Sequence, residues 1–220
     1  MSRSQLMQPP DKEHSERRRI GEALVGAVAA RGYANTTLEM VLERAGVDRA
    51  AFHAHYRDLD ACFTEVWERI AREFREAATA AYAAADSWRD GIAAVAWRFC
   101  RFLQEDHPRA RFFMVELEFA GERVQAGRDV ITDGYVDLVH LGRSVRPEGE
   151  ALPRATAEGI IGAIWKGAAR AVQADNFAYL PSVVPQTMYL TVLPYLGPEA
   201  AQQELRRGPA DIALYERGEI

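Results

Sequence analysis

A glycine turn between two short helical stretches restricts the fold of this chain more than any other feature. Gly46 ends one stretch, and Asp48 precedes the next, which runs roughly over residues 49–56. Glycine permits a sharp turn, and aspartate is a preferred N-cap for the helix that follows it. Residues 45–56 therefore have the form of a helix-turn-helix, in which we expect Phe52 to pack inward.

Apolar residues recur at helical spacing on both sides of this turn. Upstream, the spacing predicts a helix over residues 17–31 that ends at Gly32, and then a short helix capped by Thr36 with Glu39 completing a capping box. Downstream, we expect helices at about 60–85, 88–105, 109–120, 123–146, 153–175, 182–196 and 198–206. No window alternates as a β-strand would, and no fixed-period repeat is present. The predicted fold class is all-α.

Composition and charge exclude some classes of protein. The hydrophobic fraction of 48% is too high for a disordered chain, and the net charge of −5 does not by itself indicate nucleic-acid binding. Residues 1–60 are nevertheless electrically balanced, with nine basic and nine acidic side chains, so the negative excess lies in residues 61–220. The N-terminal part is thus the less acidic one.

The start of the sequence, its longest apolar stretch and its cysteines indicate a cellular location. The start lacks the apolar segment of a signal peptide, and the longest strongly apolar stretch, around residues 160–165, is too short to span a bilayer. Cys62 and Cys100 lie among apolar residues in helical patterns, which favours core thiols over a disulfide framework, with a redox switch as the alternative. We therefore expect a cytoplasmic protein.

Motifs of catalysis are missing from the sequence. It contains no glycine-rich phosphate loop, no Gly-x-Ser-x-Gly and no His-Glu-x-x-His. His53 and His55 are two residues apart, so on a helix they point about 200° apart and could not chelate one metal ion. The expectation is a protein that is not an enzyme and has no cofactor and no metal site.

Residues 17–63 resemble the tetracycline-repressor (TetR) family. The resemblance rests on 32–37 leading into the second helix, the turn 45–48, Phe-His-Ala-His-Tyr at 52–56, and Asp-Ala-Cys-Phe at 60–63. The chain departs from the family pattern at three positions, where the family usually has tyrosine, lysine and alanine: His53, Leu59 and Leu42. The missing lysine removes one phosphate contact, which bears on DNA affinity more than on the fold.

The resemblance implies roles in binding double-stranded operator DNA. Its recognition helix would present three candidates for base edges, Arg49, Ala50 and His53. The candidates for phosphate contacts are Arg17, Thr36, Thr37, His55 and Arg57. Two alternatives stay open: Arg49 as a solvated surface residue, and His55 as a partly buried packing residue.

The rest of the chain is expected to hold a small molecule and to form a homodimer. Candidates for the ligand pocket are Trp97, Phe102, Phe113, Glu116 and Trp165, although each could instead belong to the core or surface. A stripe of small residues lets another helix approach closely, and the candidates for the dimer interface are Gly159, Ala163, Gly167, Ala171 and Met188. The alternative for this stripe is a central helix of the monomer.

These expectations combine into one domain plan. Residues 1–15 would be a flexible arm, 16–60 a helix-turn-helix DNA-binding domain, and 61–220 a helical ligand-sensing and dimerisation domain. The resemblance implies a ligand-responsive transcriptional regulator, a repressor released from a palindromic operator by a small, largely apolar effector, with no membrane partner. The alternative is a helical protein–protein interaction module that has lost sequence-specific DNA binding.

Overall fold

The described part of the chain is built from helices alone. The computed structural model describes residues 9–115, 121–145 and 152–209, and within these ranges it contains no strand. The α-helices are α1 (Pro9–Arg31), α2 (Leu38–Ala45), α3 (Arg49–His55), α4 (Leu59–Ala83), α5 (Trp88–Glu105), α6 (His107–Met114), α7 (Glu122–His140), α8 (Arg154–Gln173) and α9 (Leu180–Glu204). Short 3-10 turns η2 (Tyr33–Asn35), η4 (Leu141–Val145) and η6 (Phe177–Tyr179) join some of them. The all-α prediction is confirmed.

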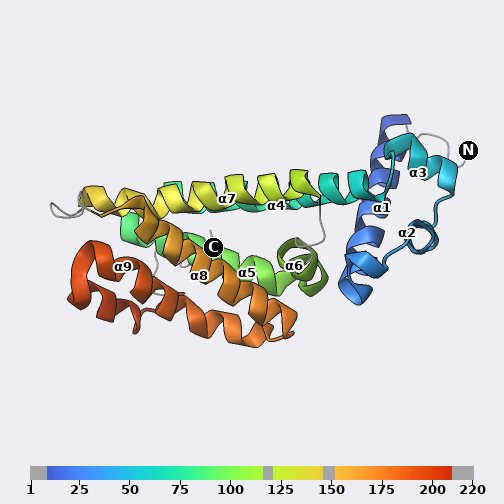
Figure 1. Ribbon diagram of the computed structural model, residues 1–220. Helices are drawn as coiled ribbons and strands as arrows, with labels where there is room; N and C mark the ends of the chain where they lie inside the picture. The colour runs from blue at the N-terminus through green and yellow to red at the C-terminus, as the bar shows by residue number, and fades with distance from the viewer. Residues whose placement is uncertain (1–8, 116–120, 146–151, 210–220) are drawn as a thin grey trace, which may run out of the picture.

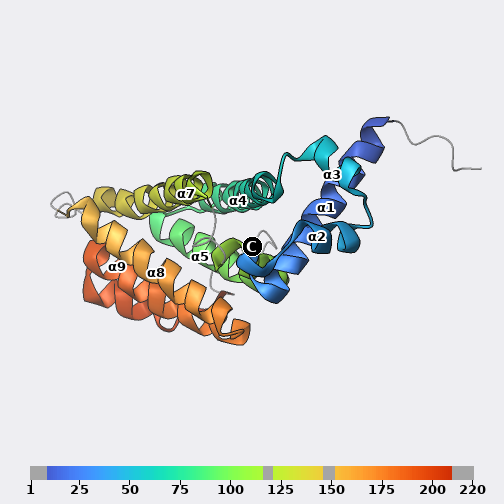
Figure 2. The same ribbon diagram turned by 45° about the vertical axis from the view of Figure 1, so that its right-hand side comes forward.

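The helices form two unequal parts (Figure 1). Helices α1, α2 and α3 gather at one end of the molecule, and α4 leads from this end into the larger part, where it runs beside α7. Helix α5 lies between α4 and α9, and α8 packs against α7 and α9 (Figure 2). Because α4 follows α3 after a short loop, it joins the two parts directly.

Local signals explain where the first helices begin. The Asp48 carboxylate accepts a hydrogen bond of 2.7 Å from the amide of Ala51, which confirms it as the cap of α3. Gly46, with φ of 63°, adopts the left-handed conformation that the turn before α3 requires. The cap of α2, however, is Thr37 and not Thr36, because the Thr37 hydroxyl accepts from the amide of Met40 at 3.4 Å.

Several helix boundaries differ from the predicted ones; for example, the helices predicted to end at residues 120 and 146 end at Met114 and His140. Helix α1 begins at Pro9, well before the predicted residue 17. Proline fits a first turn, because the amide hydrogen that it lacks has no partner within the helix there. The predicted break after residue 196 is present as non-helical backbone at Gly197, with φ of 81°, although α9 continues beyond it.

A row of large side chains on α4 anchors the core. Phe63, Trp67, Ile70 and Phe74 are spaced by three or four residues and are all at most 3% exposed. The indole nitrogen of Trp67 donates to the carbonyl oxygen of Phe113 at 3.3 Å, which ties α4 to α6. This helix therefore stabilises the larger part over its whole length.

Both cysteines are free and buried, as the sequence predicts. Burial raises the pKa of the Cys62 thiol to about 12 and that of Cys100 to about 11. Both thiols are therefore protonated near neutral pH, and neither is a reactive thiolate. Among the described helices, none is both long and apolar enough to cross a membrane.

Candidate nucleic-acid interface and apolar cavity

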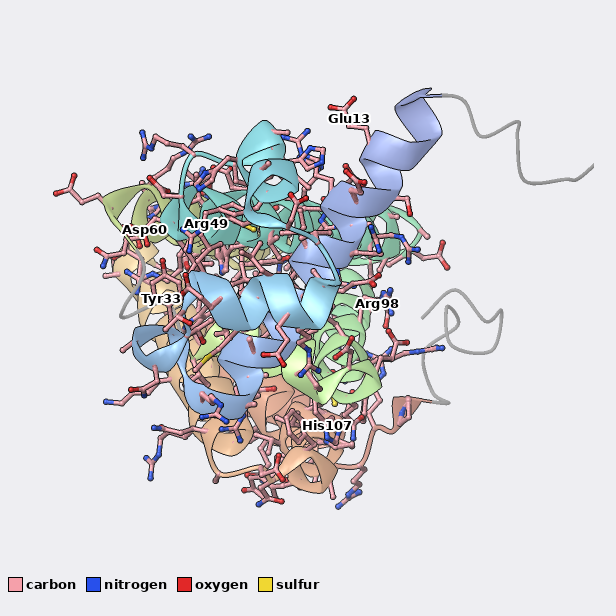
Figure 3. The ribbon with its side chains drawn as sticks, turned by 90° about the vertical axis from the view of Figure 1, so that its right-hand side faces the viewer. Glu13, Tyr33, Arg49, Asp60, Arg98 and His107 are labelled. Atoms are coloured by element: carbon pink, nitrogen blue, oxygen red, sulfur yellow. The ribbon has the colours of Figure 1, made fainter. Side chains whose placement is uncertain are left out.

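One side of helix α3 is buried in the protein, and its first turn is exposed to solvent. Phe52 is fully buried beneath it, whereas Arg49, Ala50 and His53 are exposed. Figure 3 looks onto this end of the molecule, where Arg49 is labelled. The three predicted base-contacting residues thus share the accessible side of one short helix, a placement that suits insertion into a major groove.

Arg49 has an acidic neighbour on α2. Its guanidinium pairs with the carboxylate of Glu39, and both side chains are more than half exposed. The pKa of Glu39 is lowered, first by its own backbone amide and then by Arg49. An exposed pair of this kind contributes little to stability, so Arg49 can exchange Glu39 for another acceptor at small cost.

Two predicted phosphate contacts lie in the protein interior. The side chain of His55 is only 4% exposed, and its Nε2 lies 3.4 Å from Glu16 of α1. Thr36 is 8% exposed, and its hydroxyl donates to the carbonyl oxygen of Gly32 at 2.9 Å. The His55 contact joins α3 to α1, whereas the Thr36 hydrogen bond stays within the loop between α1 and α2, so both side chains have partners inside the protein.

The remaining phosphate candidates are on the surface. Arg57 is 85% exposed and pairs with its neighbour Asp58 at 2.6 Å. Arg17 pairs with Glu65 at 2.9 Å, with its guanidinium 5.5 Å from the centre of the Tyr56 ring. Thr37 is exposed beside the start of α2. These three can meet a phosphate without unfolding any part of the chain.

The larger part contains an apolar cavity of about 1050 Å³ that opens to the surface, where Gly159 and Gly167 of its lining are exposed. Its lining comes mainly from α5, α7, α8 and α9, and it includes one of the predicted pocket residues, Trp165. Trp97, Phe102 and Phe113 are outside the lining; the last two are buried core residues, and Phe113 touches Trp165 from behind, with ring centres 5.9 Å apart. Glu116 lies outside the described residues.

Sequence reasoning missed most of the lining, because residues of several helices, α4 among them, make it. Phe74, Phe99 and Tyr135 bring aromatic rings to it, and Ile160, Ile161 and Ile164 bring branched side chains from α8. Each has the same helical spacing as an ordinary core residue. No local signal separates the two roles, since a cavity depends on how the helices pack.

The predicted interface residues border the same cavity. Gly159, Ala163 and Gly167 are exposed on α8, Ala171 is half-buried, and Met188 of α9 is 3% exposed. A side-chain carbon added at Gly159 or Gly167 would meet no atom within 4 Å. The small-residue stripe therefore faces open space in the single chain. Helix α8 is thus not a central helix of the monomer.

No ligand set for a metal is present in the described ranges, where no group of three histidine, cysteine or acidic side chains converges.

Comparisons with known proteins agree with this arrangement. Residues 22–66 match the family model described as bacterial regulatory proteins, tetR family. No curated protein matches the chain in sequence.

Several solved structures share the fold at low identity. The fatty acid degradation regulator FadR from Bacillus halodurans has a TM-score of 0.72 at 16% identity, covering 80% of this chain and 94% of its own. FadR from Bacillus subtilis, solved in complex with stearoyl-CoA, has a TM-score of 0.66 at 19% identity, covering 82% and 98%. TylP, a TetR regulator from Streptomyces fradiae, has a TM-score of 0.67 at 18% identity, covering 93% and 97%. Residues 22–66 thus match the tetR family of bacterial regulatory proteins, and the chain as a whole has the fold of solved regulators of this family.

Proposed function

We propose that this protein is a ligand-responsive repressor, a homodimer that binds a palindromic operator and is released by a small, largely apolar molecule. The observation that carries this proposal is the apolar cavity of about 1050 Å³ in the part that α4 joins to the DNA-binding helices. A cavity of this size is at the upper end of ordinary small-molecule sites. FadR of Bacillus subtilis, which has the same fold, was solved with an apolar acyl chain in stearoyl-CoA.

Operator recognition would use the exposed side of α3. Arg49 would leave Glu39 and bind the O6 and N7 of a guanine, while the Ala50 methyl would meet a thymine methyl. Arg17, Thr37 and Arg57 would contact phosphates and set the orientation of the helix. The exposure of these side chains supports the assignment.

Dimerisation would use α8 and α9. The exposed small residues Gly159, Ala163 and Gly167 allow a second helix to approach α8 closely. A two-fold dimer built this way would present two copies of α3, and each would enter one half of a symmetric DNA site. In this arrangement residues 16–60 bind DNA, while residues 61–220 sense the ligand and form the dimer.

Release requires a ligand that prefers one arrangement of the two copies of α3. Trp165 borders the cavity and touches Phe113 of α6 on its other side. Helix α6 packs against α1, and α4 continues directly into the loop after α3. A ligand that displaces Trp165 would therefore act on elements that position α3.

A reciprocal titration tests the switch. An apolar molecule found by its ability to release operator DNA is titrated into the protein alone and into the protein saturated with operator. Linkage requires the ligand to bind the DNA complex more weakly by the factor with which it weakens DNA binding, typically about 5–150-fold. Equal ligand affinities in the two titrations would show that the molecule is not the inducer.

The alternative, a helical protein–protein module without sequence-specific DNA binding, draws on the acidic balance of the chain and on Leu59 in place of the lysine. Retention on mixed genomic DNA separates the two functions. A DNA-binding dimer elutes as salt rises, with a slope set by its phosphate contacts, whereas the module would not be retained at low salt.

A further inference from the structure

The carboxylate of Glu65 joins α4 to both α1 and the end of α3. Glu65 lies in the second turn of α4, the part of this helix that runs beside α1 (Figure 1). Its Oε2 accepts a hydrogen bond of 2.9 Å from the guanidinium of Arg17 on α1. Its Oε1 accepts one of 3.1 Å from the hydroxyl of Tyr56, the C-cap of α3. Each carboxylate oxygen thus binds a different element of the DNA-binding part.

Tyr56 is the buried member of this cluster. It is 5% exposed, and its backbone amide donates to the carbonyl oxygen of Phe52 at 2.9 Å. Its ring also lies 5.5 Å from the ring of Phe52. Burial raises the pKa of the Tyr56 hydroxyl above its usual range, so the group stays a neutral donor at physiological pH. Because Phe52 is the buried residue of α3, the bond from Tyr56 to Glu65 fixes the end of α3 to α4.

The guanidinium of Arg17 is held from two sides. Besides its bond to Glu65, it lies over the ring of Tyr56, in a position that attracts a cation. Nevertheless the Arg17 side chain is 46% exposed. A guanidinium carries five N–H donors in one rigid plane. One edge of Arg17 can therefore stay on Glu65 while another meets a DNA phosphate.

A second ion pair on α1 provides a comparison. Arg18 pairs with Glu22 at 3.0 Å, and this pair joins two neighbouring turns of the same helix. Both side chains are more than half exposed, and such isolated pairs contribute little. The Glu65 cluster joins three helices and includes a buried hydroxyl, so its members support one another.

We propose that Glu65 is a positioning residue for DNA binding: it holds Arg17 in place for a phosphate and fixes the end of α3 through Tyr56. The inference rests on the repressor function proposed above and adds a residue that acts on DNA through two others. Its sign distinguishes it from simple charge repulsion. Loss of a carboxylate near DNA ordinarily strengthens binding, whereas loss of a positioning carboxylate weakens it.

The test compares the removal of a carboxylate at these two places. The probe is a fluorescent duplex with the sequence that wild type enriches from a random library. Anisotropy measures its binding over a range of salt concentrations to the full-length wild type, Glu65→Ala, Glu65→Gln and the control Glu22→Ala. Arg17→Ala and the double variant Arg17→Ala/Glu65→Ala complete a cycle. Thermal unfolding shows which variants are folded.

We expect Glu65→Ala to weaken binding about tenfold and to lower the salt slope by about one per protomer, because Arg17 loses its place at the phosphate. Glu65→Gln keeps one acceptor oxygen and should give an intermediate slope. Glu22→Ala should bind as tightly as wild type or up to about twofold more tightly. In the Arg17→Ala background, Glu65→Ala should leave the slope unchanged.

Two results would overturn the inference. One is a Glu65→Ala protein that binds DNA as tightly as wild type, or more tightly as Glu22→Ala does. The other is a loss of affinity in Glu65→Ala with the slope of wild type, since Glu65 would then support the fold alone. If Glu65→Ala does not fold, the slope of Glu65→Gln decides, and a wild-type slope overturns the inference. Wild type that binds no DNA would refute the proposed function itself, whereas failure in the variants alone leaves that function standing.

Discussion

The ring of Phe63 on α4 lies 4.6 Å from the ring of Tyr33 in the DNA-binding part. On its other side it lies 4.4 Å from Phe112 of α6. Phe113, the next residue, touches Trp165 in the cavity wall. Aromatic contacts therefore link the cavity wall and the DNA-binding part through α6, where Phe112 and Phe113 are neighbours in the chain. Spatial continuity does not by itself establish coupling, which has to be measured.

Replacing the ring of Phe63 should uncouple the ligand cavity from the DNA-binding helices. Phe63→Leu keeps an apolar side chain of similar size but loses the contacts with Tyr33 and Phe112. We expect ligand affinity to be within about twofold of wild type while the ratio of operator affinities without and with ligand falls several-fold. The control is Phe177→Leu, which removes a buried ring that stacks on His107 instead. A ratio that stays at the wild-type value in Phe63→Leu would exclude this route.

The proposed base contact of Arg49 is tested by comparison with Arg57, a proposed phosphate contact. Arg49→Ala should cost about 1–3 kcal/mol of operator affinity and relax the base preference at one position of each half-site. Arg57→Ala should weaken all sequences alike and lower the salt slope by about one. Fluorescence anisotropy on a set of operator variants measures both. If Arg49→Ala keeps the base preference, Arg49 is not a base contact.

The ion pair with Glu39 should restrain Arg49 in the free protein. Glu39→Gln removes the pairing charge, so Arg49 becomes available and operator affinity should rise a few-fold at low salt. Glu43→Gln removes an equal charge from the exposed surface of the same helix and is the matched control. Equal gains in the two variants would assign the effect to net charge alone.

The predicted dimer interface is tested with two glycine-to-tryptophan variants, one inside the interface and one outside it. Gly167→Trp places a large ring on the exposed stripe of α8, where an added Cβ would meet no atom of the single chain within 4 Å. We expect sedimentation to show folded monomers at concentrations where wild type is dimeric. Gly134→Trp adds the same ring at another open helical glycine, on α7, and should stay dimeric. A Gly167→Trp dimer of normal affinity would place the interface elsewhere.

Short-range chemistry explains what the sequence could predict. Gly46 and Asp48 act on residues next to them, so the turn and the start of α3 are visible in the sequence. The burial of His55 depends on Glu16, 39 residues earlier in the chain, and the burial of Thr36 depends on how its loop folds back on Gly32. The His55 contact is not encoded locally, so the sequence leaves open whether this side chain binds phosphate or packs inside the protein.

The cavity illustrates the same limit. The gathering of large aromatic residues in the larger part predicts Trp165 as a pocket residue, but it equally predicts Phe102, which is core. Tyr135 lines the cavity although its spacing along α7 is that of a core residue. That placement depends on the packing of α4, α7 and α8 around it, and periodicity contains no information about it.

Selection of DNA from a random-sequence library by the purified protein tests the central claim most directly. The account predicts an enriched inverted repeat, because two copies of α3 related by a two-fold axis read two equivalent half-sites. Selection with Arg49→Ala in parallel should lose a defined base in each half. Recovery of no enriched sequence, or of a single unrepeated half-site, would contradict a dimeric repressor that reads DNA with α3.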